Sequence, residues 1–263
     1  MLTSFLKTCF WVFFYMIIGE IKAQTPDHPF GKHAIIRYGG LERADSTRKN
    51  IYLVFTGHEF NDGKKMVPKI LKKAACPAHF FFTGDFYRNP ANKKMIKRLK
   101  RHGHYLGPHS DKHLLYASWN NRDSLLISKE GFVKDVLDNY LAMQTFGITK
   151  ADAAYFMPPY EWYNPKISDW TEALGLSLVN FTPGTRSNAD YTTPDMGNRY
   201  ISSKAIFQKI LDYEKQSSCG LNGFILLVHI GTHPGRKDKF YYLLPELIDE
   251  LKARGYEFTL LKV

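Results

Sequence analysis

The chain alternates short apolar runs with longer segments whose apolar residues recur every three or four positions. The short runs are rich in β-branched and aromatic residues, which is typical of buried strands. They lie at 51–55, 78–82, 104–108, 154–156, 176–181, 224–229 and 256–261.

The segments between these runs have helical spacing. They are predicted at 66–74, 92–101, 132–146, 165–175 and 241–254. The second ends in Lys and Arg just before Gly103, and basic residues followed by glycine suit a helix C-terminus. Asn164 followed by Pro165 is a favourable N-cap and first-turn pair.

The alternation of strand and helix predicts an α/β fold whose parallel sheet is buried on both faces. About seven such units favour a distorted parallel (β/α) barrel over a two-domain enzyme. An open doubly wound sheet is the alternative. No G-x-G-x-x-G follows the first strand and no Walker motif is present, which removes the usual nucleotide-binding reasons for such a sheet.

The first residues have the pattern of a secretory signal peptide. Lys7 precedes an apolar run over 9–19, and the small residue Ala23 follows. The run is too short to span a bilayer, which needs about 20 residues. We therefore expect a signal peptide over 1–23 and a single domain over 24–263 that is secreted or periplasmic; an uncleaved N-terminal anchor is the alternative.

The chain is strongly basic, with a formal charge of +11 that becomes +10 without residues 1–23. Such a surface favours anionic partners. The basic residues are spread along amphipathic helices such as 93–100 and do not form a compact patch with interleaved aromatics, so no nucleic-acid partner is predicted. Cys76 and Cys219 are expected to be ordinary small residues, since two distant cysteines define no disulfide framework.

Polar and aromatic clusters follow five of the predicted strands. They occupy 56–63, 109–113, 157–163 and 182–190, and His229 ends the fifth strand. In parallel barrels the carboxyl ends of the strands form the face that carries the active site. These clusters are therefore expected to meet at one rim.

His109 and His113 are the strongest candidates for chemistry in this set. A spacing of four residues places both imidazoles on one face if the segment is helical, which suits two ligands of a borderline metal such as zinc. The alternative is a pair of surface or capping histidines.

The sequence around this pair resembles a known metal motif. Residues 107–113 (G-P-H-S-D-K-H) are similar to the His-Ser/Thr-x-x-His motif of the polysaccharide deacetylases of the NodB-homology type, carbohydrate esterase family 4. Residues 78–84 resemble the family's A-T-F-F-V-x-G strand, 158–160 the end of its R-x-P-Y/F motif, 226–229 its L-x-H motif and 241–261 its last helix and strand. The motifs occur in the family's order over about 50–263.

The resemblance implies a distorted barrel and a divalent metal, with zinc the expected ion, held by one aspartate and two histidines. It also implies that water attacks an acetyl group of a poly- or oligosaccharide. His109 and His113 would be ligands, and His229 would be the acid that protonates the leaving group. The backbone N–H of Tyr160 would stabilise the oxyanion.

Two positions depart from the family's pattern. Thr56 and Gly57 stand where its two adjacent aspartates, the base and the third ligand, are expected, and Met157 replaces the arginine that pairs with the base. Loss of one member would leave a buried charge unpaired, which is costly. Because the aspartates and the arginine are missing together, no buried charge is left unpaired, and we expect nearby side chains to replace them.

Three versions of the rebuilt site are open. In the favoured version Glu59 is the third metal ligand, and His58 or Asp62 is the base that reaches the metal-bound water. In the second, His58 is the ligand and Glu59 the base. In the third, residues 60–63 replace the family's first motif, with Asp62 as ligand and Asn61 in the base's place. A polar loop with an Asp-Gly turn is the structural alternative.

Further residues complete the candidate site. His229 needs an orienting partner if it is catalytic, and Asp190 in the preceding loop is the candidate; a hydrogen-bonded core histidine is the alternative. Tyr160, Trp162 and Tyr163 form a candidate platform for sugar rings, since such rings suit amphipathic ligands. Core packing is the alternative for one or two of them.

Three functions follow from these residues. The leading hypothesis is a metal-dependent carbohydrate deacetylase that removes N- or O-acetyl groups from a glycan. The second is a glycan-binding module that kept the barrel and lost the base. The third is a metal hydrolase that acts on a different bond, since fold does not fix chemistry.

Overall fold

The computed structural model describes residues 30–262. The predicted signal peptide over 1–23 lies outside these residues and stays a prediction. No helix in the described part of the chain is both long and apolar enough to cross a membrane.

The central strand of the sheet is β3 (Asn50–Gly57), the longest strand among the described residues. It pairs in parallel with β8 (Phe224–His229) on one side and with β4 (His79–Phe82) on the other. β4 in turn pairs in parallel with β5 (Tyr105–Pro108). The carboxyl ends of these four strands therefore lie at one rim, as the sequence predicts.

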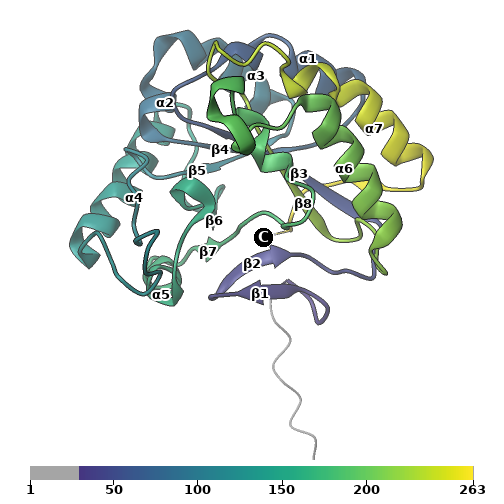
Figure 1. Cartoon of the computed structure of the whole chain (residues 1–263). Coiled ribbons are helices and arrows are strands. Elements are labelled where there is room, and N and C mark those ends of the chain that lie inside the picture. The colour runs from purple at the N-terminus through teal and green to yellow at the C-terminus, as the bar shows by residue number, and fades with distance from the viewer. Residues whose placement is uncertain (1–29, 263) are drawn as a thin grey trace, which may run out of the picture.

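A hairpin of β1 (Ile35–Arg37) and β2 (Gly40–Arg43) extends the sheet beyond β8, and β2 runs antiparallel to β8 (Figure 1). On the far side β6 (Tyr155–Phe156) pairs in parallel with β7 (Ser177–Leu178). The short strand β9 (Glu257–Phe258) pairs with the start of β3.

Two links close these strands into a ring. The amide of Met157 donates to the carbonyl of Pro108 at 3.3 Å, which joins β6 to β5. A parallel bridge between Leu41 and Val179 joins β2 to β7. The ring β2-β8-β3-β4-β5-β6-β7 confirms the predicted distorted barrel of about seven strands, in which the β6–β7 side is short and irregular.

Helices surround this sheet, as Figure 1 shows. They are α1 (Val67–Lys73), α2 (Gly84–Arg88), α3 (Lys93–Arg101), α4 (Lys129–Gln144), α5 (Pro165–Ala173), α6 (Ser203–Gln216) and α7 (Leu244–Ala253). The predicted cap of α5 is present, because the side chain of Asn164 accepts a hydrogen bond from the amide of Ile167 at 3.0 Å.

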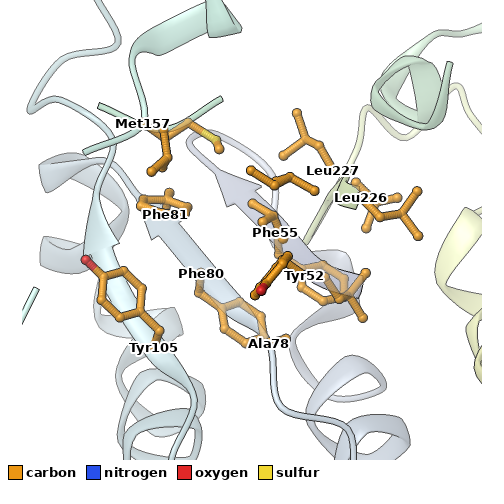
Figure 2. Close-up of a cluster of buried hydrophobic side chains, with 14 of the residues drawn as sticks. Tyr52, Phe55, Ala78, Phe80, Phe81, Tyr105, Met157, Leu226 and Leu227 are labelled. Carbon is orange, nitrogen blue, oxygen red and sulfur yellow. The ribbon is translucent and has the colours of Figure 1, made fainter. Parts of the chain in front are cut away.

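The core fills the interior between the sheet and the helices. Figure 2 shows part of it, in which Phe80 of β4 stacks on Phe55 of β3, and Leu226 and Leu227 of β8 belong to the same cluster. Met157 closes this cluster at the carboxyl end of the strands. The site is therefore built directly on a dry, closely packed base.

Several elements differ from the predictions. The β1–β2 hairpin, α2 and α6 are additional, and α4 begins three residues earlier than predicted, at Lys129. The predicted strands at 176–181 and 256–261 shrink to two residues each, and the backbone groups beyond them make single bonds to other strands: Asn180 to Leu41 of β2, Thr182 to Ile225 of β8 and Thr259 to Ile51 of β3. Cys76 and Cys219 are both free; Cys76 is buried as expected and Cys219 is half-buried.

One buried cation fixes the segment that leads to β8. The guanidinium of Arg236 is fully buried and donates to the carbonyls of Thr192 and Ile201 and to the Ser203 hydroxyl at 2.7, 3.0 and 2.8 Å. These acceptors come from the segment that follows Asp190 and from Ser203, the first residue of α6. Arg236 therefore holds this segment against the barrel.

Replacement of Arg236 by Met should lower the free energy of unfolding by about 3 kcal/mol, because several buried acceptors lose their donor together. Urea unfolding measures this change. The matched control is Lys237→Met, whose exposed side chain should change stability by less than about 0.5 kcal/mol. Equal stability of the two variants would contradict the assigned role of Arg236.

Candidate active site

His109 and His113 come together at the carboxyl end of β5. Their ring centroids are 5.0 Å apart. The spacing of four residues places both imidazoles on one face only in a helix, and this segment is not a helix. Ser110 and His113 instead have left-handed backbones, with φ of 68° and 57°. The amide of His113 donates to the Ser110 hydroxyl at 2.8 Å, and this tight loop brings the two imidazoles together.

Two acidic residues anchor the loop from outside the site. Arg88 donates to both carboxylate oxygens of Asp111, at 2.7 and 2.9 Å. Asp135 accepts from the amide of Lys112 at 3.1 Å and from the hydroxyl of Tyr116 at 2.6 Å. These contacts compensate for the left-handed residues, which cost free energy and persist only where the surroundings hold them.

The hydrogen bonds of His109 fix its tautomer. Its Nδ1 lies 2.8 Å from the carbonyl oxygen of Met157, and a carbonyl can only accept. Nδ1 therefore carries the hydrogen, and Nε2 keeps its lone pair. Burial lowers the pKa of His109 to about 3 and, with the nearby imidazoles of His109 and His58, that of His113 to about 2. Both rings are neutral at working pH, as metal ligation requires.

Glu161 also belongs to this site, and the sequence analysis missed it. Its Oε1 lies 3.9 Å from Nε2 of His109, and 11 % of its side chain is exposed. Burial raises the pKa of Glu161 to about 7. Its place directly after the Pro158-Pro159-Tyr160 motif, at the end of β6, was the available signal. Carboxylates with strongly perturbed pKa values cluster at functional sites.

His58 lies on the outer side of the histidine pair. Its ring is stacked on that of His113, with centroids 4.6 Å apart and planes 7° apart. Its Nδ1 is 3.2 Å from the hydroxyl of Thr83. Burial lowers the pKa of His58, so the ring is neutral at pH 7. The structure therefore brings His58, His109 and His113 together.

Glu59 and Asp62 face a neighbouring cavity of about 510 Å³ instead. Asp62 accepts from the amide of Thr232, the hydroxyl of Tyr241 and the ammonium of Lys239, at 2.8, 2.9 and 3.1 Å. Glu59 is exposed. Within residues 30–262, Glu161 and Asp190 are the carboxylates at ion-pair distance from a histidine of this rim. In this conformation Glu59 and Asp62 do not reach the pair.

The expected contact between Asp190 and His229 is present. Oδ1 of Asp190 lies 2.6 Å from Nδ1 of His229, and Oδ2 accepts from the amide of His229 at 3.0 Å. Burial disfavours the charged imidazole, but the charge and hydrogen bond of Asp190, with Glu161, outweigh it and raise the pKa of His229 above its usual value. Asp190 is almost fully buried, so its orientation is fixed.

Aromatic side chains border the site on the side of His113. The Tyr160 ring lies 4.4 Å from that of His113 and 5.7 Å from that of Trp119, and Tyr160 and Trp119 are 45 % and 54 % exposed. Trp119 was not predicted. Trp162 lies behind Trp119 at 5.1 Å. Tyr163 is a correction, because it is buried in the core and donates to the carbonyl of Arg37 at 2.8 Å, so it offers no face to a sugar.

The positions that lack the family's charged residues have been repacked. A Cβ at Gly57 would lie 2.8 Å from side-chain atoms of Ile230 and Phe82, so no aspartate fits there without a shift. Met157 is buried in the core. The hydroxyl of Thr56 is buried and has no hydrogen-bond partner within the described part of the chain, which marks a place for a water or ligand oxygen.

The donor set can be tested against the metal that the family implies. Among residues 30–262 no three His, Cys, Asp or Glu side chains lie close enough together in this conformation to hold a metal ion. Two donors at about 2.0–2.1 Å from a tetrahedral zinc would be about 3.3 Å apart. The 3.9 Å between His109 and Glu161 needs only a contraction of about 0.6 Å, so the neutral imidazoles and this carboxylate fit a divalent ion in their chemistry.

Replacement of Asp190 by Asn should lower the pKa of His229 below the usual value of about 6.5, because burial remains and the favourable charge is lost. In the wild type the raised pKa contributes stability that is fully present below about pH 6.5 and is lost as the pH rises through the folded-state pKa. A titration of the His229 ring signals by NMR measures both proteins.

The exposed Asp195 provides the control, since Asp195→Asn should leave the His229 titration unchanged. An identical His229 pKa in wild type and Asp190→Asn would show that Asp190 does not hold the imidazolium.

Comparison with known proteins places this geometry in a family. The family model for polysaccharide deacetylases matches residues 43–179. The peptidoglycan-N-acetylmuramic acid deacetylase PdaA of Bacillus subtilis is 27% identical over 242 residues, which cover 91% of this chain and 80% of PdaA.

Solved structures agree in fold. The structure of Bacillus subtilis PdaA, a family 4 carbohydrate esterase, superposes with a TM-score of 0.65 at 22% identity and covers 84% of this chain and 82% of that one. A family 4 pseudoenzyme from Bacillus anthracis superposes with a TM-score of 0.64 at 17% identity, over 84% of this chain and 67% of its own. The chain therefore belongs to the polysaccharide deacetylase family, within carbohydrate esterase family 4.

Proposed function

We propose that the protein is a metal-dependent deacetylase that hydrolyses acetyl groups of a cell-envelope glycan. The observation that carries the proposal is the convergence at one rim of two neutral histidines, a buried carboxylate and a carboxylate-held histidine. Core packing alone does not require four such groups at the end of a barrel. The relationship to PdaA supports N-acetylated amino sugars of peptidoglycan as the first substrates to try.

In this proposal His109 and His113 hold the ion, with zinc the expected metal. When bound, the ion supplies Lewis-acid polarisation of the acetyl carbonyl and lowers the pKa of a water molecule. His109 is oriented by its hydrogen bond to Met157, which keeps Nε2 directed at the site.

The remaining steps belong to residues of this chain. His58, neutral and next to His113, accepts a proton as water oxygen bonds to the acetyl carbon. The N–H of Tyr160 donates no hydrogen bond within the described residues and is available to the oxyanion. His229, whose pKa the neighbouring Asp190 raises, then protonates the leaving nitrogen or oxygen as its bond to the acetyl carbon breaks, which releases acetate.

The exposed rings of Trp119 and Tyr160 form the sugar platform of this proposal. They lie beside His113, so a ring bound against them places its substituents near the histidines. Aromatic faces with polar edges suit the apolar faces of sugars. In this proposal Trp119, and not the buried Tyr163, completes the sugar platform with Tyr160.

A glycan-binding module without turnover is the second candidate. The observation that favours it is the presence of Thr56, Gly57 and Met157 where the family has its base, its ligand and its arginine. The Bacillus anthracis structure shows that a pseudoenzyme exists on this fold. The same site without an ion would still offer Trp119 and Tyr160 to a sugar.

The direct test measures acetate release from N-acetylated peptidoglycan fragments, an acetylated chito-oligosaccharide and an acetylated xylan. The wild-type protein should release acetate from at least one of them, and His229→Ala should lower kcat by about 10²–10⁴-fold because it removes the acid. The exposed His33 gives the matched control, His33→Ala, which should retain full activity.

Treatment with a chelator should abolish the reaction, and added Zn²⁺ should restore it. Sugar binding without acetate release, unchanged by the chelator, would overturn the proposal in favour of the binding module. Cleavage of non-acetylated glycans would instead indicate a hydrolase for a different bond.

Replacement of Trp119 by Ala should raise KM for an oligosaccharide about tenfold and change kcat little, because the ring binds sugar at a distance from the reacting bond. Steady-state kinetics on the best of these substrates measures the split. Leu126→Ala, at another exposed apolar position, is the control. An unchanged KM would remove Trp119 from the platform.

A further inference from the structure

We propose that Glu161 is the third ligand of the metal site and replaces the aspartate that the family carries at the position of Gly57. The inference rests on the proposed function, because it requires that the site holds an ion. It moves the ligating carboxylate from the end of β3 to the loop after β6, on the opposite side of the histidine pair. None of the three versions considered from the sequence includes this residue.

The contact between Glu161 and His109 is the first argument. Nε2 of His109 has a lone pair, since Nδ1 gives its hydrogen to the carbonyl of Met157. A carboxylate oxygen therefore faces an unprotonated nitrogen at 3.9 Å. When Glu161 is ionised, both atoms are electron-rich, and a divalent cation between them would offset the cost of burying that charge; 3.9 Å is too long for a direct hydrogen bond.

The backbone of the loop is the second argument. Tyr160 and Glu161 both have left-handed conformations, with φ of 59° and 53°, which is costly for two successive residues with side chains. Three hydrogen bonds hold this turn: Glu161 and Trp162 donate to the carbonyls of Pro158 and Pro159, and Asn180 donates to the carbonyl of Glu161 at 3.0 Å. The fold therefore holds a strained turn that places the Glu161 carboxylate beside His109.

The positions and contacts of the other candidate carboxylates are the third argument. The family's ligand position is closed, because side-chain atoms of Ile230 and Phe82 lie 2.8 Å from a Cβ at Gly57. The carboxylate of Asp62 already accepts hydrogen bonds from Thr232 and Tyr241 and pairs with the ammonium of Lys239. Glu59 is exposed and lines a different cavity. Glu161 is thus the carboxylate of the described chain that the fold offers to Nε2 of His109.

The test is titration of the metal-free full-length protein with Zn²⁺ by calorimetry. We expect one Zn²⁺ per chain for the wild type. Glu161→Gln should weaken Zn²⁺ binding at least about 100-fold, since even the partners behind a ligand contribute 10–100-fold. Glu172→Gln, an exposed carboxylate on α5, is the matched control and should bind like the wild type. The absorption spectrum of the Co²⁺-loaded protein should also change in Glu161→Gln and stay unchanged in Glu172→Gln.

Acetate release is measured on the same samples, so that different failures are distinguishable. Wild-type protein that binds Zn²⁺ and releases acetate, together with a Glu161→Gln variant that binds Zn²⁺ equally well, would overturn this inference alone. Loss of Zn²⁺ binding in Glu59→Gln but not in Glu161→Gln would do the same and assign the ligand to Glu59. A folded wild type that neither binds Zn²⁺ nor releases acetate would overturn the proposed function and this inference together. Thermal melts of each variant verify folding.

Discussion

The hydrogen bond from Nδ1 of His109 to the carbonyl of Met157 connects the architecture of the barrel to the chemistry of its rim. The same two strand ends meet through the amide of Met157 and the carbonyl of Pro108, which closes the barrel between β5 and β6. Closure therefore orients the imidazole and leaves Nε2 free of hydrogen. It also brings the loop after β6, with Tyr160 and Glu161, over His109 and His113.

The packing around this junction of β5 and β6 explains how the family's charged residues can be absent without leaving an unpaired buried charge. An arginine at position 157 would need a carboxylate partner, and a carboxylate at position 57 would need space and a counter-charge. The chain has Met157 in the core and Gly57 against Phe82 and Ile230, so both requirements disappear together. The remaining carboxylates that meet the histidines, Glu161 and Asp190, each approach one imidazole nitrogen.

Much of the fold was predictable from the sequence, because the barrel strands that form the central sheet are continuous apolar runs and most helices have clear ends. The β1–β2 hairpin and α2 were not predicted, since short elements at the edge of a sheet carry little periodic signal. For α6 a signal existed: Ser202 accepts from the amide of Ala205 as an N-cap, and apolar residues follow at helical spacing.

The site was predictable where a residue type and its position at a strand end coincide. This holds for the proximity of His109 to His113 and for the contact of Asp190 with His229. The direction of side chains in the loops was not predictable. Glu59 and Asp62 turn to a neighbouring cavity, whereas the left-handed pair at 160 and 161 brings Glu161 to His109. Such turns depend on tertiary hydrogen bonds, which local sequence does not specify.

The most direct test of the rebuilt site is the anomalous scattering of zinc in crystals of the protein grown with Zn²⁺. We predict one strong peak next to Nε2 of His109, the imidazole of His113 and the carboxylate of Glu161. A peak bonded to Glu59 or Asp62 would contradict the assignment of Glu161. The absence of any peak at the histidine pair at saturating Zn²⁺ would contradict the account of this rim as a metal site.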